Sequence, residues 1–294
     1  MRNESDRPLT GFLGIGAMGL PMALRILQSG QKIIAADISP AQVDKAIHQG
    51  LTATINPAEL AGASRLFVIV ATGPQLMGLL ESDLLSESTT VETVVVLSTV
   101  GVDVVRDFAR QLEGRGIGVV DCPVTGGVSG ATNGTLSLFA AGNPDVIGAV
   151  RGSLEAVGSV RDCGTRIGDG QAFKIVNQHL AASHLAVAGE AMALAAALGL
   201  DPAAALELVG SGAGASWMLT DRGPRMIQHP DQRPVQTRLS IFTKDSALVN
   251  EAAQTAGFNA RIMSVVAQQF QLAAAAGLGD ADDSAIVDLP RGFP

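Results

Sequence analysis

Three glycines near the start of the chain have the spacing of a turn that can bind a phosphate group. Gly14, Gly16 and Gly19 lie in "LTGFLGIGAMGLPMALRIL", residues 9–27, between an apolar run and a stretch of helix-forming residues. Such a site needs one glycine for a tight turn, a second where the pyrophosphate approaches the backbone, and a third where helix and strand pack closely. The free N–H groups of the helix that begins near Ala17 would point at the pyrophosphate.

A carboxylate follows these glycines at the distance expected for binding a ribose. Asp37 ends the apolar run 32–37, about 20 residues after the glycines, where it can accept hydrogen bonds from a ribose 2′-hydroxyl. Glycine-rich turns are common, but the order strand, glycines, helix, strand and acid favours a dinucleotide site. The carboxylate would repel a 2′-phosphate and no arginine follows it, which favours NAD over NADP, although Lys32 or Lys45 could reach such a phosphate.

The segments that must position these residues alternate along residues 1–150. Short apolar runs, each followed by a loop, are typical of strands that are buried on both faces of a parallel sheet. These runs are residues 9–14, 32–37, 65–71, 93–99 and 117–124, with 136–142 as a further candidate. Helical segments lie between them, such as 40–50, which has an N-terminal proline and a closing glycine. This half is predicted to be a doubly wound α/β domain of the Rossmann type.

After about residue 168 the sequence changes to alanine-rich helical segments. Residues 170–200 contain no proline, and a helix of that length would be roughly 46 Å long at 1.5 Å per residue. No strand-like alternation appears in the segments that follow. We therefore predict a Rossmann domain at 1–169 and an all-helical domain at 170–294, entered by a long interdomain helix, with the ligand between the two.

The composition excludes several classes of protein. The chain has 294 residues, of which 47% are hydrophobic and 16% charged, and its net charge is -8, which indicates a globular protein and argues against a nucleic-acid partner. The only two cysteines, Cys122 and Cys163, provide no metal-binding set or disulfide framework, and no metal is predicted. The polar N-terminus lacks the hydrophobic segment of a signal peptide. The apolar stretch 180–200 is interrupted by His184 and Glu190, which suits a buried or interface helix better than a membrane span. We expect a cytoplasmic protein without membrane contact.

Four blocks of sequence resemble the β-hydroxyacid dehydrogenase family, which includes 3-hydroxyisobutyrate dehydrogenase and tartronate semialdehyde reductase. The first is "GFLGIGAMGLPMA", in which Met18 and Pro21 fit as well as the glycines do. The second, "DCPVTGGVSGATNGTLSLFAAG", resembles the substrate loop, with Cys122 and Thr125 where alanine and serine are usual. The third, "GDGQAFKIVNQ", resembles the catalytic helix, and the fourth, "KDSALVNEAA" with "GLGDADDSA", the C-terminal region.

These blocks are in order and span nearly the whole chain, so the resemblance implies a fold like that of 6-phosphogluconate dehydrogenase. It also implies NAD(P)-dependent oxidation of a small 3-hydroxy acid, or the reverse reduction. Residues 70–75 and 216–226 look closer to the L-threonate dehydrogenase branch, so the substrate is expected to be 3-hydroxyisobutyrate-like or L-threonate-like. The alternative for 216–226 is a helical turn capped by Asp221, with its arginines in solvent.

Oxidising an alcohol requires a hydride acceptor, a base for the hydroxyl proton and an anchor for the substrate. On a helix, Lys174, Asn177 and Gln178 share one face. The amine can therefore take the proton while the amides hold substrate oxygens, and the resemblance implies the same roles. The pKa of a lysine is ordinarily about 10.4; burial, the positive nicotinamide ring and Lys244 would favour the neutral form.

The ends of other strands supply the remaining contacts. Successive backbone N–H groups in the glycine turn 125–127 can bind a substrate carboxylate. Ser98 and Thr99 would face the cofactor near its ribose and nicotinamide, and Lys244 would contact it from the helical domain. The alternative for Lys244 is a cation on the helix surface that pairs with Asp245 or Glu251. The predicted cofactor-binding residues are Gly14, Ile15, Gly16, Ala17, Met18, Gly19, Asp37, Ile38, Ala71, Thr72, Ser98, Thr99 and Lys244. The predicted substrate-binding residues are Thr125, Gly126, Gly127, Asn177 and Gln178.

Other functions share parts of this pattern. Imine reductases have the same architecture but usually carry aspartate or tyrosine at the position of Lys174. A dinucleotide-binding scaffold without turnover would lack that lysine, and a glycine-rich methyltransferase would bind S-adenosylmethionine. The apolar surface of the alanine-rich helices further predicts a homodimer or homotetramer that packs through the helical half.

Overall fold

The computed structural model describes residues 8–291, with the side chains of 290 and 291 excepted. Residues 1–7, on which the expectation of no signal peptide depends, lie outside the described residues. The chain divides into two compact units at the peptide bond between Lys174 and Ile175. Each unit is described by itself.

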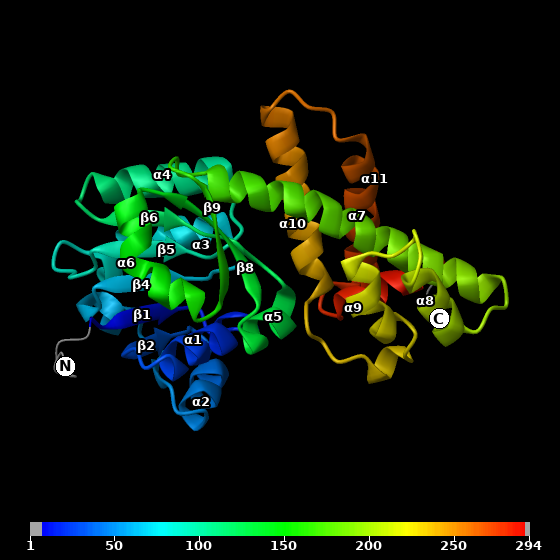
Figure 1. Ribbon diagram of the computed structural model, residues 1–294, viewed down its shortest axis with the longest axis horizontal. Helices are drawn as coiled ribbons and strands as arrows, with labels where there is room; N and C mark the ends of the chain where they lie inside the picture. The colour runs from blue at the N-terminus through cyan, green and yellow to red at the C-terminus, as the bar shows by residue number, and fades with distance from the viewer. Residues whose placement is uncertain (1–7, 292–294) are drawn as a thin grey trace. The chain divides into compact units, whose positions relative to one another are not determined.

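The first unit is built around a nine-stranded sheet with helices on both sides (Figure 1). Its strands are β1 (Thr10–Leu13), β2 (Ile33–Ala36), β3 (Thr52–Thr54), β4 (Arg65–Val68), β5 (Thr93–Val96), β6 (Gly118–Asp121), β7 (Val124–Thr125), β8 (Leu136–Gly142) and β9 (Gly158–Gly164). Its helices are α1 (Gly19–Gln28), α2 (Pro40–His48), α3 (Gly73–Gly78), α4 (Val102–Glu113), α5 (Gly127–Asn133) and α6 (Pro144–Glu155). Three short 3-10 helices cover 57–62, 79–81 and 83–85.

The strand order makes this unit a Rossmann-type domain, as predicted. β3, β2, β1, β4, β5 and β6 lie in that order and are parallel. The order reverses between β1 and β4, so the loops that follow these two strands flank the switch point where dinucleotides bind in such sheets. The further candidate at 136–142 is a strand, β8, but it runs antiparallel to β6 and β7 and parallel to β9.

The apolar runs predicted as strands are buried on both faces of the sheet. In β5, Val95 packs in the hydrophobic cluster on one face, whereas Val94 and Val96 pack in the cluster on the other. Phe12 and Leu13 of β1 divide in the same way. Alternate residues point to opposite faces of a strand, so a continuous apolar run is needed when helices cover both faces.

The second unit is helical, as predicted for the C-terminal part. It contains most of α7 (Asp169–Ala197), followed by α8 (Pro202–Gly210), α9 (Trp217–Met226), α10 (Leu239–Thr255) and α11 (Arg261–Ala273). Short 3-10 helices at 230–232 and 283–291 and a π-helical turn at 274–278 complete it. α7 begins in the first unit and ends within a few residues of the long helix predicted at 170–200.

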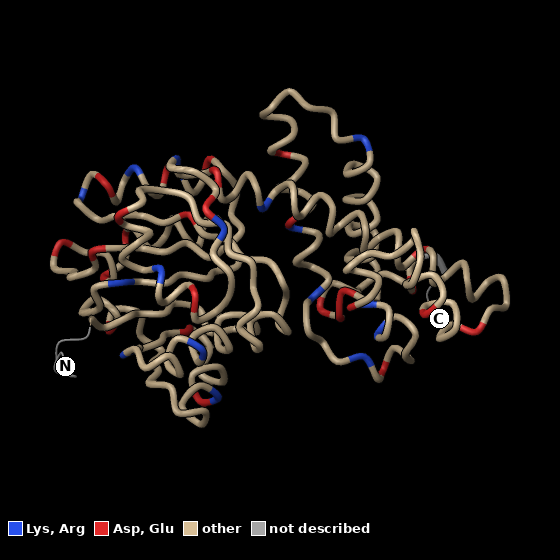
Figure 2. Tube along the Cα trace, viewed as in Figure 1, with Lys and Arg blue, Asp and Glu red and all other residues tan. Residues whose placement is uncertain are grey.

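α7 is the longest helix of the described residues and is rich in alanine. It is the one helix there that meets the criteria for a membrane span, and 44% of its most apolar window is buried inside the protein. Its charged residues are Asp169, Lys174 and Glu190, and Figure 2 shows the helix as a mostly uncharged tube. The core of the second unit includes Leu185 and Met192 of this helix, which favours the interpretation as a buried or interface helix.

The alternative interpretation of residues 216–226 is wrong. The segment forms α9, which is capped by the hydroxyl of Ser216 and not by Asp221. Its arginines are buried, and each has a carboxylate partner: Arg222 pairs with Asp283, and Arg225 pairs with Asp282. Buried guanidinium groups require such partners, so these pairs hold the C-terminal 3-10 helix against α9.

Candidate active site

The glycine turn after β1 has the three local conditions that a pyrophosphate site requires. Gly14 has a φ of +92°, and a Cβ there would lie 2.1 Å from the Ile69 carbonyl oxygen. A Cβ on Gly19 would lie 1.9 Å from the Gly14 carbonyl oxygen, because α1 packs closely on the end of β1. A Cβ on Gly16 would have no atom within 4 Å. The backbone at Gly16 is therefore open to a ligand, and the turn fits the pyrophosphate of a dinucleotide.

Asp37 lies beside this turn and holds it. Its Oδ2 accepts a hydrogen bond of 2.8 Å from the Ile15 N–H, and its Oδ1 accepts one of 2.9 Å from the Ser39 N–H. The carboxylate thus links the end of β2 to the glycine loop and to the start of α2. Ile38 is 81% exposed beside it. The structure therefore brings the predicted ribose ligand and the predicted pyrophosphate loop into direct contact.

The loops after β4 and β5 are joined by the side chain of Ser98, a residue of the predicted cofactor set. The Oε1 atom of Gln75 accepts hydrogen bonds from the Ala71 and Thr72 N–H groups, and Thr72 caps α3. The Ser98 hydroxyl is buried and accepts a hydrogen bond of 2.7 Å from the Val70 N–H. Ser98 therefore spaces the ends of β4 and β5, next to the switch point of the sheet.

The predicted anion site lies between β7 and α5. Gly126 and Gly127 have φ values of +127° and +64°, in the region that only glycine adopts readily. Thr125 ends β7 and pairs with Ser137 of β8. The structure thus places both glycines in one turn at the start of α5, and the carboxylate site there stays a prediction.

Lys174 is an almost fully buried lysine, with 7% of its surface exposed. It lies in the second turn of α7, the last residue of the first unit. Asn177 and Gln178 follow three and four residues later on the same helix, so the three side chains share one helix face. Lysine is seldom buried in proteins unless it is paired or functional.

In the second unit, the predicted amides and the predicted cofactor lysine are connected through one carboxylate. The Asn177 Nδ2 donates to Gln178 Oε1 at 2.9 Å, and the Gln178 Nε2 donates to Asp245 Oδ2 at 2.5 Å. Lys244 Nζ lies 3.0 Å from Asp245 Oδ1. That oxygen is buried and has no hydrogen-bond partner of good geometry, so the interaction with Lys244 is an ion pair without a well-directed hydrogen bond. Both ends of the Gln178 amide are thus engaged within the protein.

Two residues of this region, Asp121 and Gln171, were not predicted from the sequence, and Asp245 was considered only as an ion-pair partner of Lys244. All three are buried and hydrogen-bonded to segments far away in the chain. For Asp121, the available signal was a carboxylate at the end of an otherwise apolar run. Gln171 had only its proximity to Lys174.

Within residues 8–291, no group of three or more His, Cys, Asp and Glu side chains is placed to hold a metal ion. Cys122 is buried, and burial raises the pKa of its thiol well above the usual value. Burial likewise raises the pKa of Cys163 to about 11. Neither thiol is therefore activated for nucleophilic chemistry.

Comparison with known proteins places the chain in a family. Residues 10–168 match the family model described as the NAD binding domain of 6-phosphogluconate dehydrogenase. Residues 168–289 match a second family model, which is described as NAD-binding of NADP-dependent 3-hydroxyisobutyrate dehydrogenase. The chain is 30% identical to an L-threonate dehydrogenase of Cupriavidus necator, with 96% of each chain covered. It is 31% identical to an L-threonate dehydrogenase of Escherichia coli, with 96% of this chain and 95% of the relative covered.

A solved structure gives the same result. The crystal structure of 3-hydroxyisobutyrate dehydrogenase from Salmonella typhimurium has a TM-score of 0.87 and 30% identity, and the match covers 96% of this chain and 99% of that one. The family and the two-part fold predicted from the four sequence blocks are thereby confirmed. The chain belongs to the β-hydroxyacid dehydrogenase family of nicotinamide-dependent oxidoreductases.

Proposed function

We propose that this protein oxidises the hydroxyl group of a small hydroxy acid with NAD, and that Lys174 is its general acid/base. The observation that carries the proposal is the nearly complete burial of Lys174 on a helix whose same face carries Asn177 and Gln178. A general base must be held within hydrogen-bond reach of the proton that it takes, and the packing around a buried side chain holds it in place.

Each residue has a defined part in the reaction. The nicotinamide ring, when bound, accepts the hydride from the substrate carbon. Lys174 Nζ takes the hydroxyl proton during oxidation and returns it to the carbonyl oxygen during reduction. Asn177 contacts a substrate oxygen, and Gln178, whose amide is engaged at both ends, orients Asn177. Lys244 contacts the cofactor.

A carboxylate on the substrate is supported by the turn at residues 125–127. Backbone N–H groups in a glycine turn can bind an anion, and the Thr125 hydroxyl adds a donor. L-Threonate and 3-hydroxyisobutyrate both carry this group. Since relatives at 30% and 31% identity are L-threonate dehydrogenases, we propose an L-threonate-like acid as the first substrate to test.

NAD is proposed over NADP because of the position of Asp37. Its carboxylate faces the glycine loop, where a 2′-phosphate would meet a like charge. Lys32 precedes β2, at the opposite end of that strand from Asp37, and Ile38 provides no positive charge. Localisation in the cytoplasm stays a prediction.

The proposal is tested by measuring NADH and NADPH formation with L-threonate, 3-hydroxyisobutyrate and glycerate. Lys174→Ala should lower kcat at least about a thousandfold, because it removes both the base and its positioning, while the Kd for NAD changes less than about twofold. Lys32→Ala, at the far end of β2, is the matched control and should keep wild-type kcat. Nearly unchanged turnover in Lys174→Ala would reject the assignment, and reduction of a cyclic imine in place of the acids would favour the imine reductase alternative.

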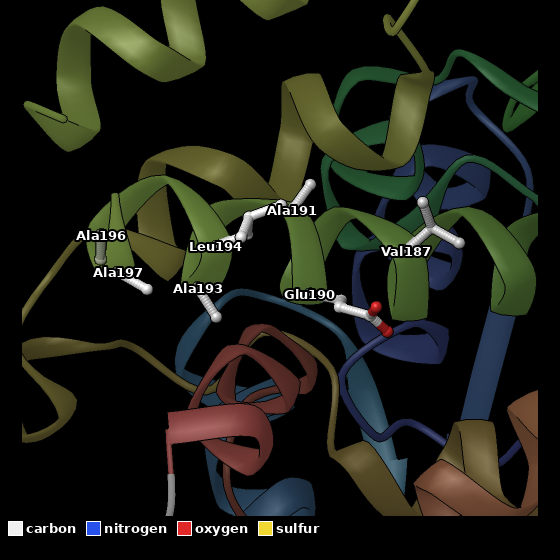
Figure 3. Close-up of a pocket in the computed structure, with 7 residues that line it drawn as sticks. All are labelled: Val187, Glu190, Ala191, Ala193, Leu194, Ala196 and Ala197. Atoms are coloured by element: carbon white, nitrogen blue, oxygen red, sulfur yellow. The ribbon is translucent and has the colours of Figure 1, made fainter. Parts of the chain in front are cut away.

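We also propose a homodimer or homotetramer that packs through α7. This helix exposes large apolar side chains, with Val187 63% and Leu194 57% exposed. A hollow of about 720 Å³ runs along it (Figure 3), more than ten residues beyond Lys174, and is lined by Val187, Glu190, Ala191, Ala193, Leu194, Ala196 and Ala197. Exposed apolar patches of this kind commonly mark interfaces. Sedimentation as a monomer at micromolar concentration would contradict the proposal.

A further inference from the structure

A buried carboxylate and a buried amide meet at the start of α7, and the proposed chemistry uses neither. Asp121 is the last residue of β6, and Gln171 lies in the first turn of α7, 50 residues later. Both side chains are fully buried. Polar groups in this position oppose folding unless they are hydrogen-bonded, so their partners indicate what they do.

The Gln171 amide joins α7 to the ends of two neighbouring strands. Its Oε1 accepts hydrogen bonds from the Val100 and Gly101 N–H groups at 3.0 and 3.1 Å, in the loop after β5. Its Nε2 donates to the Ser98 carbonyl oxygen and to Asp121 Oδ1, both at 3.0 Å. All donors and acceptors of the amide are therefore matched. The two N–H groups at Oε1 also prevent the amide from turning over, so its Nε2 must face Asp121.

The second oxygen of Asp121 caps α7 from outside the helix. Oδ2 accepts hydrogen bonds from the N–H groups of Gly168 and Gln171 at 2.9 and 3.0 Å. The first N–H groups of a helix have no acceptor within it, and a negative charge near them is favoured by the helix dipole. The end of β6 thus holds the beginning of α7.

Gly170 allows the helix to lie against the sheet at this point. A Cβ there would lie 2.5 Å from the Phe139 carbonyl oxygen and 2.8 Å from the Asp121 carbonyl oxygen. Backbone carbonyls of β6 and β8 therefore fill the space that a side chain would need. The position of the first turn of α7 is set by backbone contact as well as by the hydrogen bonds.

We propose that Asp121 and Gln171, here called the Asp121–Gln171 clasp, are positioning residues for Lys174. The clasp fixes the first helical turn on the ends of β5 and β6, and the amine of Lys174 follows three residues later, about 4.5 Å further along the helix axis. β5 leads into the loop that carries the predicted cofactor residues Ser98 and Thr99, and β6 leads toward the turn at residues 125–127. The clasp therefore sets the distance from the Lys174 amine to both of these segments. This inference rests on the proposed role of Lys174.

A second observation supports a functional reason for the carboxylate. Burial raises the pKa of Asp121 to about 6, although hydrogen bonds from Gln171 and Gly168 lower it. Ionisation of this carboxylate at neutral pH therefore lowers the free energy of unfolding. Perturbed carboxylates of this kind are concentrated at functional sites.

The test uses Asp121→Asn. Asparagine keeps the size, and its oxygen can still accept the two backbone N–H groups, but its amide nitrogen would meet Gln171 Nε2, donor against donor. We expect kcat to fall roughly 10- to 100-fold with the best acid of the panel, since a displacement near 1 Å can lower a rate about a hundredfold. The Kd for NAD should change less than about twofold. Backbone amides at 168–174 should exchange hydrogen faster in the variant.

The decisive comparison is Asp121→Asn in the Lys174→Ala background. If the clasp acts through the amine, the second substitution lowers the residual rate less than about twofold there. An equal factor in both backgrounds would overturn the proposal while leaving the role of Lys174 intact. Failure of the proposed function itself is visible separately, as unchanged turnover in Lys174→Ala alone.

A matched control and a second variant exclude simple loss of folding. Ser153→Ala removes the hydrogen bond from another buried side chain of the same unit to Gln31 Oε1, and should leave kcat unchanged. If Asp121→Asn does not fold, Gln171→Glu replaces the amide donor by a carboxylate facing Asp121. Its kcat relative to wild type should recover as the pH falls and a shared proton restores the donor. A ratio that is constant with pH would overturn the proposal.

Discussion

The glycine turn can be divided into a residue that folding requires and a residue that the cofactor requires. The test compares Gly19→Ala with Gly16→Ala. Both add one methyl group, and neither glycine has a positive φ, so backbone strain is not the difference between them. What differs is the space around each methyl group.

For Gly19→Ala, the structure predicts a loss of stability. The new Cβ would lie 1.9 Å from the Gly14 carbonyl oxygen, whereas ordinary contacts begin at 3.4 Å. The helix or the turn must therefore move by about 1.5 Å. Overpacking typically costs about 1–3 kcal/mol, and the contact here is with backbone, so about 3 kcal/mol is expected. At roughly 2–4 °C per kcal/mol, the Tm should fall by about 6–12 °C.

For Gly16→Ala, the structure predicts normal folding and impaired binding. No atom lies within 4 Å of the new Cβ, and Gly→Ala at such a position stabilises a protein by about 0.4–1 kcal/mol through the unfolded state. The methyl group would occupy the space through which the pyrophosphate approaches. We expect the Kd for NAD to rise at least about tenfold, which is about 1.4 kcal/mol.

The assay is calorimetric titration with NAD, together with thermal unfolding of the protein without cofactor. Gly62→Ala is the control, because its Cβ also meets open space but lies in the 3-10 helix at 57–62, outside the turn. Gly62→Ala should bind NAD as wild type does. If folded Gly16→Ala binds NAD within about twofold of wild type, the pyrophosphate does not approach Gly16 and the reasoning is refuted.

Two further predictions concern buried carboxylates. Asp245→Asn should raise both the KM for the hydroxy acid and the Kd for NAD by roughly 3- to 10-fold, because one carboxylate holds Gln178 and Lys244; kinetics and titration measure this, and an effect on one ligand alone would contradict it. Burial raises the pKa of Asp121 from 3.8 to about 6. The native protein therefore binds this proton more tightly than the unfolded chain, and the free energy of unfolding should fall by about 3 kcal/mol as the pH rises from about 4 to about 7. Urea unfolding should be measured across this pH range for the wild type and for Asp121→Asn. The free energy of unfolding should fall less with rising pH in the variant, and an identical fall in both proteins would contradict the assignment.

The sequence predicted those parts of the fold that depend on local patterns. Continuous apolar runs marked the central strands, because a strand covered on both faces must be apolar throughout. Alanine-rich composition and the lack of proline marked α7. The edge strands β3 and β9 were missed: β9, "GSVRDCG", is only partly buried, so it has no apolar run to find. β8 was predicted as a strand. Its antiparallel direction depends on pairing with β6 and β7, and the residues of β8 alone do not indicate those partners.

The site divides in the same way. The glycines and Asp37 belong to one short strand–helix–strand unit, so their spacing along the chain determines which groups meet. The partners of Gln171 and Gln178 lie 50 and 67 residues away. A polar residue within an apolar stretch reveals that it needs a partner, but the pairing of distant strands and helices decides which partner it finds. Only the tertiary structure could therefore connect Asp121 to the start of α7 and Asp245 to the predicted amides.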